Sequence, residues 1–265
     1  MKRLIFFLII FTISIFPAKT FAKDIIVLTV NGVINPPHSE YVIKGIKKAN
    51  EQNAEAVIIQ LDTPGGLDTS MRSIIKEMLN SQIPVIVYVS PKGARATSAG
   101  AFITLAAHIA AMAPGTNIGA AHPVAIGEKM DKTMAEKVTN DAVAYIKSIA
   151  KQKGRNTEWA EQAVRKSISS TETEALKVGI IDLIAEDLQS LVKEINGKKV
   201  KTVVGEKIIN IKGAKIYEIK MNFRERLFNF ISDPNIAYIL LTVSYTHLRA
   251  HETGRNLVCR LLLEK

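Results

Sequence analysis

The sequence has one cysteine, five histidines and few aromatic residues, which make up 6% of its 265 positions. A single cysteine, Cys259, excludes an intrachain disulfide framework and a zinc site built on cysteines. No group of histidines has the spacing of metal ligands, so we expect neither a metal ion nor another cofactor. The net charge of +10 is spread along the chain without interleaved aromatic residues that could stack on bases. We therefore expect no nucleic-acid partner, and a solvated or membrane-facing basic surface explains the charge better.

Long hydrophobic runs are also scarce, and the clearest one lies near the N-terminus. Lys2 and Arg3 precede an apolar run from Leu4 to Phe16, which is too short to span a bilayer comfortably. Thr20-Phe21-Ala22 fits a cleavage site, so we expect residues 1–22 to be a signal peptide, with an uncleaved anchor as the alternative. In both cases the rest of the chain is expected outside the cytoplasm.

From residue 23 to residue 195, apolar runs rich in Ile and Val alternate with segments of helical periodicity. The apolar runs predict buried strands at 25–33, 56–61, 83–89, 109–113 and 180–185. The periodic segments predict helices at 39–52, 69–79, 133–151 and 157–166, a small-residue helix that begins at Ser98, and a short helix entered at Thr171. Repeated βαβ units of this kind predict an α/β domain with a mostly parallel sheet.

The composition changes after residue 195. Residues 201–204 and 207–211 flank Gly205-Glu206 like a hairpin, and 223–231 has the period of an amphipathic helix. We expect a hairpin-plus-helix appendage over 196–232 and the start of a truncated transmembrane region over 233–243. Residues 244–265 carry charges that a bilayer core would reject and resemble translated adaptor sequence, so we interpret them as a non-native tail without a function.

Three motifs follow predicted strands: Asp62-Thr63-Pro64-Gly65-Gly66-Leu67, Ala96-Thr97-Ser98-Ala99-Gly100 and Met112-Ala113-Pro114-Gly115-Thr116-Asn117-Ile118-Gly119-Ala120. Ser98, framed by small residues at a helix start, suits either a nucleophile or a helix N-cap. Gly66 allows a main-chain N–H to approach a substrate closely, and Gly65 allows an unusual turn. A serine that faces such a turn has the parts of an acyl-transfer site with an oxyanion hole.

These motifs, with the later Asp233-Pro234-Asn235, resemble the NfeD-type membrane-bound serine proteases, ClpP-class relatives that include signal peptide peptidase SppA. The resemblance extends from about residue 24 to residue 242. It implies a ClpP/crotonase-like fold for the domain at 23–195 and a nucleophilic role for Ser98. It also implies an oxyanion hole formed by the N–H groups of Gly66 and Ala99, and a Ser-Lys dyad whose lysine falls on Lys137.

The base is the part of the site with the most alternatives. A lysine accepts a proton only when it is neutral, and Met134 and Val138 could supply an apolar pocket that keeps Lys137 neutral. Lys132 and Lys147 are the alternative lysines. His122 is a rival base that Asp182 could orient. If His122 is not the base, we expect it to line the substrate cleft together with Gly65.

The resemblance thus implies an extracytoplasmic, membrane-associated serine endopeptidase that cleaves hydrophobic peptide segments, with stomatin-like membrane proteins as substrates or partners. It also implies a homodimer or larger homo-oligomer. Residues 127–133, which are polar and charged, could act as a lid. One alternative is a membrane scaffold that keeps the fold and has lost catalysis. Another is a crotonase-type acyl-CoA enzyme, which the signal peptide disfavours because coenzyme A is cytoplasmic.

Overall fold

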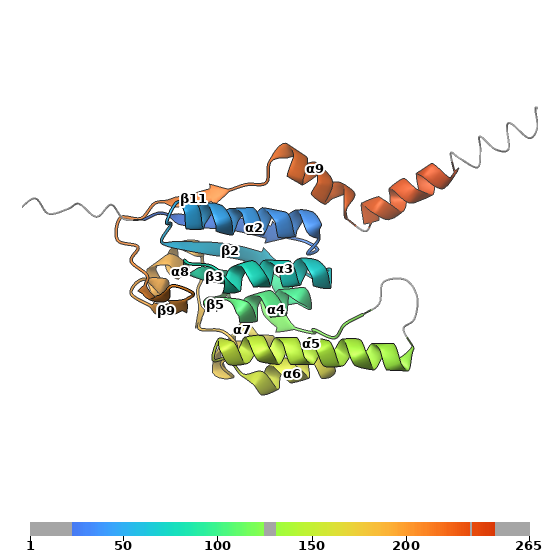
Figure 1. Ribbon diagram of the computed structural model, residues 1–265, viewed down its shortest axis with the longest axis horizontal. Helices are drawn as coiled ribbons and strands as arrows, with labels where there is room; N and C mark the ends of the chain where they lie inside the picture. Colours follow the sequence, from blue (N-terminus) through green and yellow to red (C-terminus); the bar gives the residue numbers. More distant parts are fainter. Residues whose placement is uncertain (1–22, 125–130, 234, 247–265) are drawn as a thin grey trace, which may run out of the picture.

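The computed structural model describes residues 23–124, 131–233 and 235–246 (Figure 1). The expected signal peptide at 1–22, most of the expected lid and most of the expected tail lie outside the described residues. The division of the chain into domains therefore stays a prediction.

The core of the molecule is a six-stranded sheet in which every neighbouring pair of strands is parallel. Its order is β11-β1-β2-β3-β5-β8, formed by Ile216–Ile219, Ile25–Asn31, Ala56–Asp62, Val85–Val89, Ile109–Met112 and Leu183–Ile184. The central strands are rich in Val and Ile because both faces of the sheet are covered. The predicted α/β fold with a mostly parallel sheet is confirmed.

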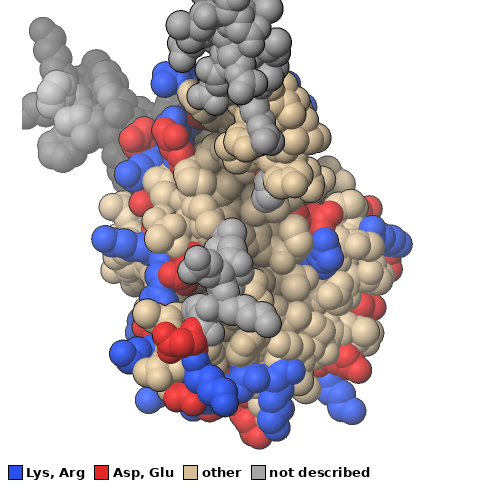
Figure 2. Space-filling view, turned by 90° about the vertical axis from the view of Figure 1, so that its right-hand side faces the viewer, with Lys and Arg blue, Asp and Glu red and all other residues tan. Residues whose placement is uncertain are grey.

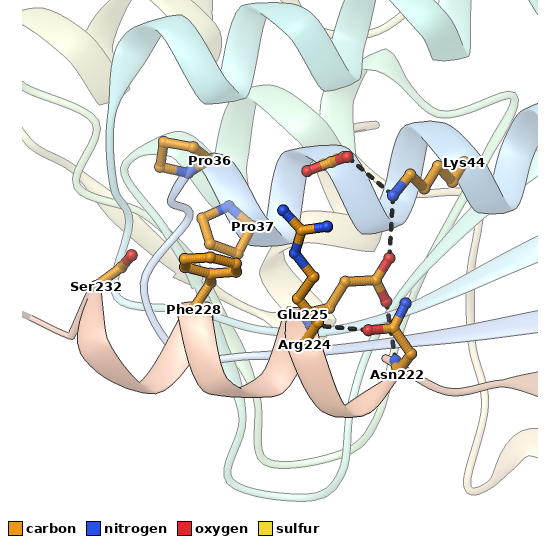
Figure 3. Close-up of a pocket in the computed structure, with 9 residues that line it drawn as sticks. Pro36, Pro37, Lys44, Asn222, Arg224, Glu225, Phe228 and Ser232 are labelled. Atoms are coloured by element: carbon orange, nitrogen blue, oxygen red, sulfur yellow. Dashed lines mark hydrogen bonds and ion pairs between the residues drawn. The ribbon is translucent and has the colours of Figure 1, made fainter.

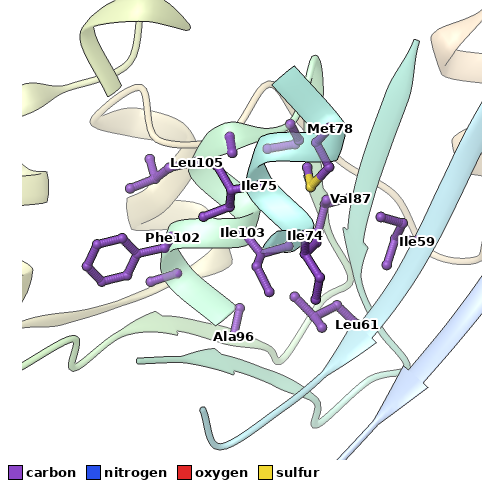
Figure 4. Close-up of a cluster of buried hydrophobic side chains, with 14 of the residues drawn as sticks. Ile59, Leu61, Ile74, Ile75, Met78, Val87, Ala96, Phe102, Ile103 and Leu105 are labelled. Carbon is purple, nitrogen blue, oxygen red and sulfur yellow. The ribbon is translucent and has the colours of Figure 1, made fainter. Parts of the chain in front are cut away.

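Helices α2 (Pro36–Glu51), α3 (Asp68–Leu79) and α4 (Ala99–Ala106) cover one face of the sheet (Figure 1). Figure 4 shows this layer, in which Ile74 and Ile103 approach side chains of β2 and β3. Helices α5 (Lys132–Gln152) and α6 (Thr157–Arg165) pack on each other, and α5 also packs on α4. The other face is covered by α8 (Leu188–Ile195) and by side chains of the segment that follows it.

Local capping explains where two of the helices begin. The Asn35 side chain accepts a hydrogen bond from the His38 N–H at 3.0 Å, and two prolines follow Asn35 at the first helical positions of α2. This helix therefore starts at residue 36 rather than at the predicted residue 39. Thr171 and Glu174 form a reciprocal capping box, so α7 (Glu172–Lys177) begins where the sequence predicted it.

A second, smaller sheet lies beside the start of α4. It contains β4 (Arg95–Thr97), β6 (Asn117–Gly119) and β7 (Ser169–Thr171), with β4 parallel and β7 antiparallel to β6. Strand β4 was not among the strands predicted from the sequence, because three residues are too few to show a strand period. This sheet fixes the chain immediately before Ser98.

The C-terminal segment differs from its prediction in two places. The hairpin pairs β9 (Lys199–Thr202) with β10 (Gly205–Ile208), so Gly205 starts a strand and the turn lies at 203–204. The unpredicted β11 joins the edge of the main sheet beside β1. Helix α9 (Phe223–Ile231) matches its predicted bounds, and residues 235–246 are also helical. None of the helices in the described ranges combines the length and the apolar character needed to cross a membrane.

Candidate active site

The turn after β2 is shaped by a buried threonine. The Thr63 hydroxyl accepts a hydrogen bond from the Gly65 N–H and donates one to the Gly65 carbonyl, each at 3.0 Å. Gly65 has a φ of +122°, a conformation that residues with a Cβ rarely adopt. The sequence motif therefore folds into a tight turn whose main chain is held from within.

A second segment of main chain clamps this turn from outside. The Ile34 N–H donates to the Gly65 carbonyl, and the Leu67 N–H donates to the Ile34 carbonyl, both at 2.8 Å. A Cβ on Gly66 would lie 2.1 Å from the Ile34 oxygen, so only glycine fits there. These bonds leave the Gly66 N–H without a backbone acceptor among the residues that the structure describes.

Ser98 lies in a sharp turn between β4 and α4, with φ of +53° and ψ of −116°. Its N–H donates to the Gly119 carbonyl at 3.0 Å, which fixes the turn to β6. Ser98 occupies the N-cap position of α4, but its side chain makes no capping hydrogen bond. A non-glycine residue with this backbone conformation is strained, as are nucleophiles on strand-to-helix turns. The geometry does not match the N-cap alternative.

The two turns are in direct contact. A Cβ on Gly65 would lie 2.7 Å from the Ser98 Cβ and 3.1 Å from its Oγ, so the Gly65 main chain borders the serine side chain. A Cβ on Gly100 would lie 2.6 Å from the Thr63 methyl group, which shows how closely α4 packs on the turn. Ala99 is the first residue of α4, so its N–H has no acceptor within the helix. The structure thus gathers Ser98, Gly65, Gly66 and Ala99 at one place.

Lys137 lies in the first part of α5 and is exposed. Figure 1 shows that this part of α5 extends beyond the body of the molecule, and the buried residues of the helix begin only at Ala142. Met134, expected to wall an apolar pocket, is itself exposed. Within the described part of this single chain, the expected pocket around Lys137 is therefore not formed.

His122 follows β6 and is exposed, and its Nδ1 lies 2.9 Å from the Val164 carbonyl oxygen. This contact is suited to a protonated Nδ1 that donates to the carbonyl and leaves Nε2 free. Asp182 does not orient this ring. Its carboxylate accepts from the Ala110 N–H at 2.7 Å and from the buried Arg155 guanidinium at 2.8 Å, at the start of β5. The alternative in which Asp182 supports His122 is therefore wrong.

Two further histidines are structural in this fold. Burial lowers the pKa of His38, whose Nδ1 lies 2.8 Å from the Val33 carbonyl oxygen. Burial lowers the pKa of His108 to about 3, and its Nδ1 accepts a hydrogen bond from the Val85 N–H. In the described ranges, no cluster of His, Cys, Asp and Glu side chains could hold a metal ion.

On the face that contains the start of α5, the surface visible beside the grey atoms is largely uncharged, and many of the Lys, Arg, Asp and Glu side chains lie along the lower edge and the sides (Figure 2). Sequence reasoning identified Ser98 and both glycines but missed Ile34. Ile34 holds the turn through its main-chain N–H and carbonyl, and it lies about thirty residues before the turn in sequence. No side-chain pattern marks such a contact. The Asn35-Pro36-Pro37 helix start was the available signal that this segment is fixed.

The chain resembles known proteins in sequence. The family model described as NfeD1b, N-terminal domain, matches residues 24–216. The membrane-bound protease PH1510 of Pyrococcus horikoshii is 41% identical over 229 residues, which cover 84% of this chain and 52% of that protein. Membrane protein NfeD1b of Bacillus subtilis is 27% identical over 244 residues, covering 87% of this chain and 51% of that protein. The chain spans about half the length of these relatives.

It also resembles solved structures of 1510-N, described as a membrane-bound stomatin-specific protease. A lysine-to-alanine mutant in complex with a substrate peptide gives a TM-score of 0.74 at 37% identity, covering 80% of this chain and 98% of that one. A serine-to-alanine mutant gives a TM-score of 0.70 at 38% identity, with 76% and 99% covered.

Proposed function

Because the chain belongs to the family of NfeD1b N-terminal domains, we propose that it is a membrane-associated serine endopeptidase with Ser98 as its nucleophile. The observation that carries this proposal is the strained turn at Ser98 packed against the Gly65 main chain. Beside it lie the N–H groups of Gly66 and Ala99, for which the described residues provide no backbone acceptor. That arrangement supplies a nucleophile and two oxyanion donors from residues adjacent to one another.

In the proposed mechanism, the Ser98 Oγ attacks the scissile carbonyl carbon and the carbonyl oxygen becomes an oxyanion. The N–H groups of Gly66 and Ala99 stabilise the negative charge. Neutral Lys137 takes the serine proton and passes it to the leaving amine, which produces an acyl-enzyme. Water then attacks the acyl-enzyme and restores Ser98. The solved structures of serine and lysine mutants of 1510-N support the choice of these two residue types.

Lys137 needs apolar surroundings that the single chain does not provide. We propose that a second copy of the chain covers the exposed start of α5, completes the pocket and favours the neutral amine by desolvation. The expected homo-oligomer would then be a requirement of catalysis. His122 and Gly65 would contact the bound peptide on either side of Ser98.

The proposed substrates are hydrophobic segments of membrane proteins, with a stomatin-like protein as the leading candidate because 1510-N is described as stomatin-specific. The names of the relatives support a membrane location. We place the protease domain on the extracytoplasmic side. A second candidate function is a scaffold for stomatin-like proteins without catalysis, which the exposure of Lys137 favours.

Peptide cleavage separates these functions. The chain should cleave a hydrophobic stomatin-derived peptide and react with a fluorophosphonate probe, and Ser98→Ala should lower kcat by about 10³-fold or more. Lys137→Ala should lower kcat to a similar extent, His122→Ala should mainly raise KM, and Lys151→Ala on the same helix should change neither constant.

Full activity of Lys137→Ala would eliminate the dyad, and loss of activity in Lys132→Ala alone would move the base to that residue. A wild-type chain that binds the peptide, cleaves nothing and ignores the probe would establish the scaffold instead.

A further inference from the structure

Helix α9 has an apolar face that the described residues leave exposed. Its members recur at the spacing of one helix face. Their exposed fractions are 75% for Phe223, 45% for Leu227, 59% for Phe230 and 42% for Ile231. No residue of α9 is buried, so this helix keeps its apolar face in solvent although it lies against the body of the chain.

The opposite face of α9 is docked on α2 by polar contacts, shown in part in Figure 3. Glu225 accepts a hydrogen bond from the Lys44 ammonium at 3.2 Å. Asn229 accepts one from the Asn35 side chain at 2.8 Å. Phe228 lies over Pro37 in Figure 3, at the edge of a cavity of about 460 Å³ between the two helices. These contacts orient α9 so that Phe223, Leu227 and Phe230 lie on the side away from α2, although Phe228 on the near side is itself 48% exposed.

An arginine borders the apolar face on each side. At about 100° per residue, Arg226 falls between the apolar face and Asn229, and Arg224 falls between it and Phe228. The Arg224 guanidinium lies 5.5 Å from the centre of the Phe228 ring. Neither arginine forms an ion pair within the part of the chain that the structure describes. An outward apolar face with cationic borders is the pattern of helices that lie in a membrane interface.

The chain that follows α9 continues this character. Residues 235–246 are helical, and most of their apolar side chains are exposed: Tyr238, Ile239, Leu240, Leu241, Val243 and Tyr245. Four residues, Ser232, Asp233, Pro234 and Asn235, separate the two apolar segments at the junction. A water-exposed surface of this composition has no stabilising role for a monomer. A lipid surface accounts for both the apolar and the cationic side chains.

We propose that α9 lies in the plane of an anionic lipid surface, with Phe223, Leu227, Phe230 and Ile231 inserted below the headgroups. Arg224 and Arg226 then meet lipid phosphates on the two borders of the helix. This inference concerns membrane contact and is independent of peptide cleavage. It has one consequence for the site, because Asn35, which holds Asn229, directly follows the Ile34 that clamps the Gly65–Gly66 turn. The helix in the interface and the candidate active site therefore share one support.

Spin labels on the full chain test the proposal. Each label reports the solvent access of its own position, so membrane contact by another apolar segment does not imitate burial of α9. In a Cys259→Ser background, labels are placed one at a time at Leu227→Cys, at Phe230→Cys and, as a control, at Glu194→Cys on α8, which is also exposed. On vesicles of phosphatidylcholine with phosphatidylglycerol at about 7:3, collision with a water-soluble nickel chelate should fall by at least about threefold at the first two positions and stay unchanged at the third.

Equal nickel accessibility at all three positions would overturn the proposal. So would dipolar broadening between labels at Leu227→Cys in the absence of vesicles, because a second copy would then cover the face. Circular dichroism confirms that each labelled chain is folded, which is expected because the three positions are exposed.

A charge-reversal pair tests the arginines. Arg224→Glu with Arg226→Glu should raise the phosphatidylglycerol needed for half-maximal protection of the Leu227→Cys label by about tenfold, or abolish protection. Lys47→Glu with Lys48→Glu makes the same charge change on exposed positions of α2. If both pairs shift the protection equally, the effect is one of net charge and the arginines have no local role.

Discussion

At the scale of single residues, the candidate site depends on main-chain geometry that few side chains tolerate. Gly66 packs against the Ile34 carbonyl, and Gly65 packs against the Ser98 side chain. Ser98 itself has a positive φ. Each of these positions couples a structural requirement to a proposed catalytic role. Substitutions can therefore separate the two.

Gly66→Ala should displace the turn, because its Cβ would lie 2.1 Å from the Ile34 oxygen. We expect kcat to fall by about 10²-fold as an oxyanion donor moves, and the free energy of unfolding to fall by about 1–3 kcal/mol from overpacking. Steady-state kinetics and chemical denaturation measure the two effects. Gly93→Ala is the matched control, since its Cβ would meet nothing within 4 Å and only its positive φ opposes the change. Unaltered kinetics in Gly66→Ala would remove Gly66 from the oxyanion hole.

Ser98→Gly should abolish cleavage and yet be more stable than Ser98→Ala by about 1 kcal/mol, because glycine adopts a positive φ without strain. Thermal or denaturant unfolding of the two variants under the same conditions gives the difference. An equal or lower stability for the glycine variant would show that the turn at residue 98 is not strained.

At the scale of elements, the parts that sequence predicts well are those with a local cause. The capping box at Thr171 and Glu174 fixed the start of α7, and the period of α9 gave its bounds. Strand β11 was missed because its partner β1 lies far away in sequence and its own four residues are half polar. The hairpin register was misplaced because Gly205, interpreted as a turn residue, uses its positive φ to begin β10.

The same distinction holds within the candidate site. Ser98 and Gly65 are marked by small residues and glycines, which the sequence displays. The clamp by Ile34 uses atoms that every residue has, so no pattern marks it. The surroundings of Lys137 cannot be read from its helix, because they depend on what packs against an exposed face.

The ring of His108, which lies where β3 and β5 begin, should make the free energy of unfolding depend on pH. His108 has a folded-state pKa of about 3, below its unfolded value of about 6.5, because burial disfavours the charged ring. The folded state therefore excludes a proton that the unfolded state binds, and stability is lost as the pH falls below about 6.5. Between pH 7 and pH 5 we expect this residue to remove about 2 kcal/mol.

Urea unfolding at the two pH values measures this loss, and His108→Asn should lack it because asparagine keeps an acceptor for the Val85 N–H without titrating in this range. If wild type and variant lose the same free energy, the pH dependence arises elsewhere.

At the scale of the whole molecule, the proposal that a second copy covers the start of α5 makes association and activity inseparable. Met134→Asp should weaken self-association and lower kcat together, while the circular dichroism spectrum of the folded chain stays unchanged, because Met134 is exposed in the single chain. Leu176→Asp replaces an apolar residue of comparable exposure on α7 and should change neither property. Analytical ultracentrifugation and peptide cleavage at matched concentrations give both readouts. A fully active monomeric Met134→Asp would refute the shared pocket.

The direction of β11 determines at which end of the main sheet α9 lies relative to the candidate site. Because β11 is parallel to β1, the chain leaves β11 at the carboxyl ends of the strands, which is the end of the sheet where Gly66 and Ser98 lie. If β11 were antiparallel to β1, α9 would lie at the opposite end of the sheet. If α9 lies on a lipid surface as proposed, Ser98 is held near the place where the chain contacts that surface. Under that proposal, segments that emerge from the same surface reach the serine more readily than peptides free in solution.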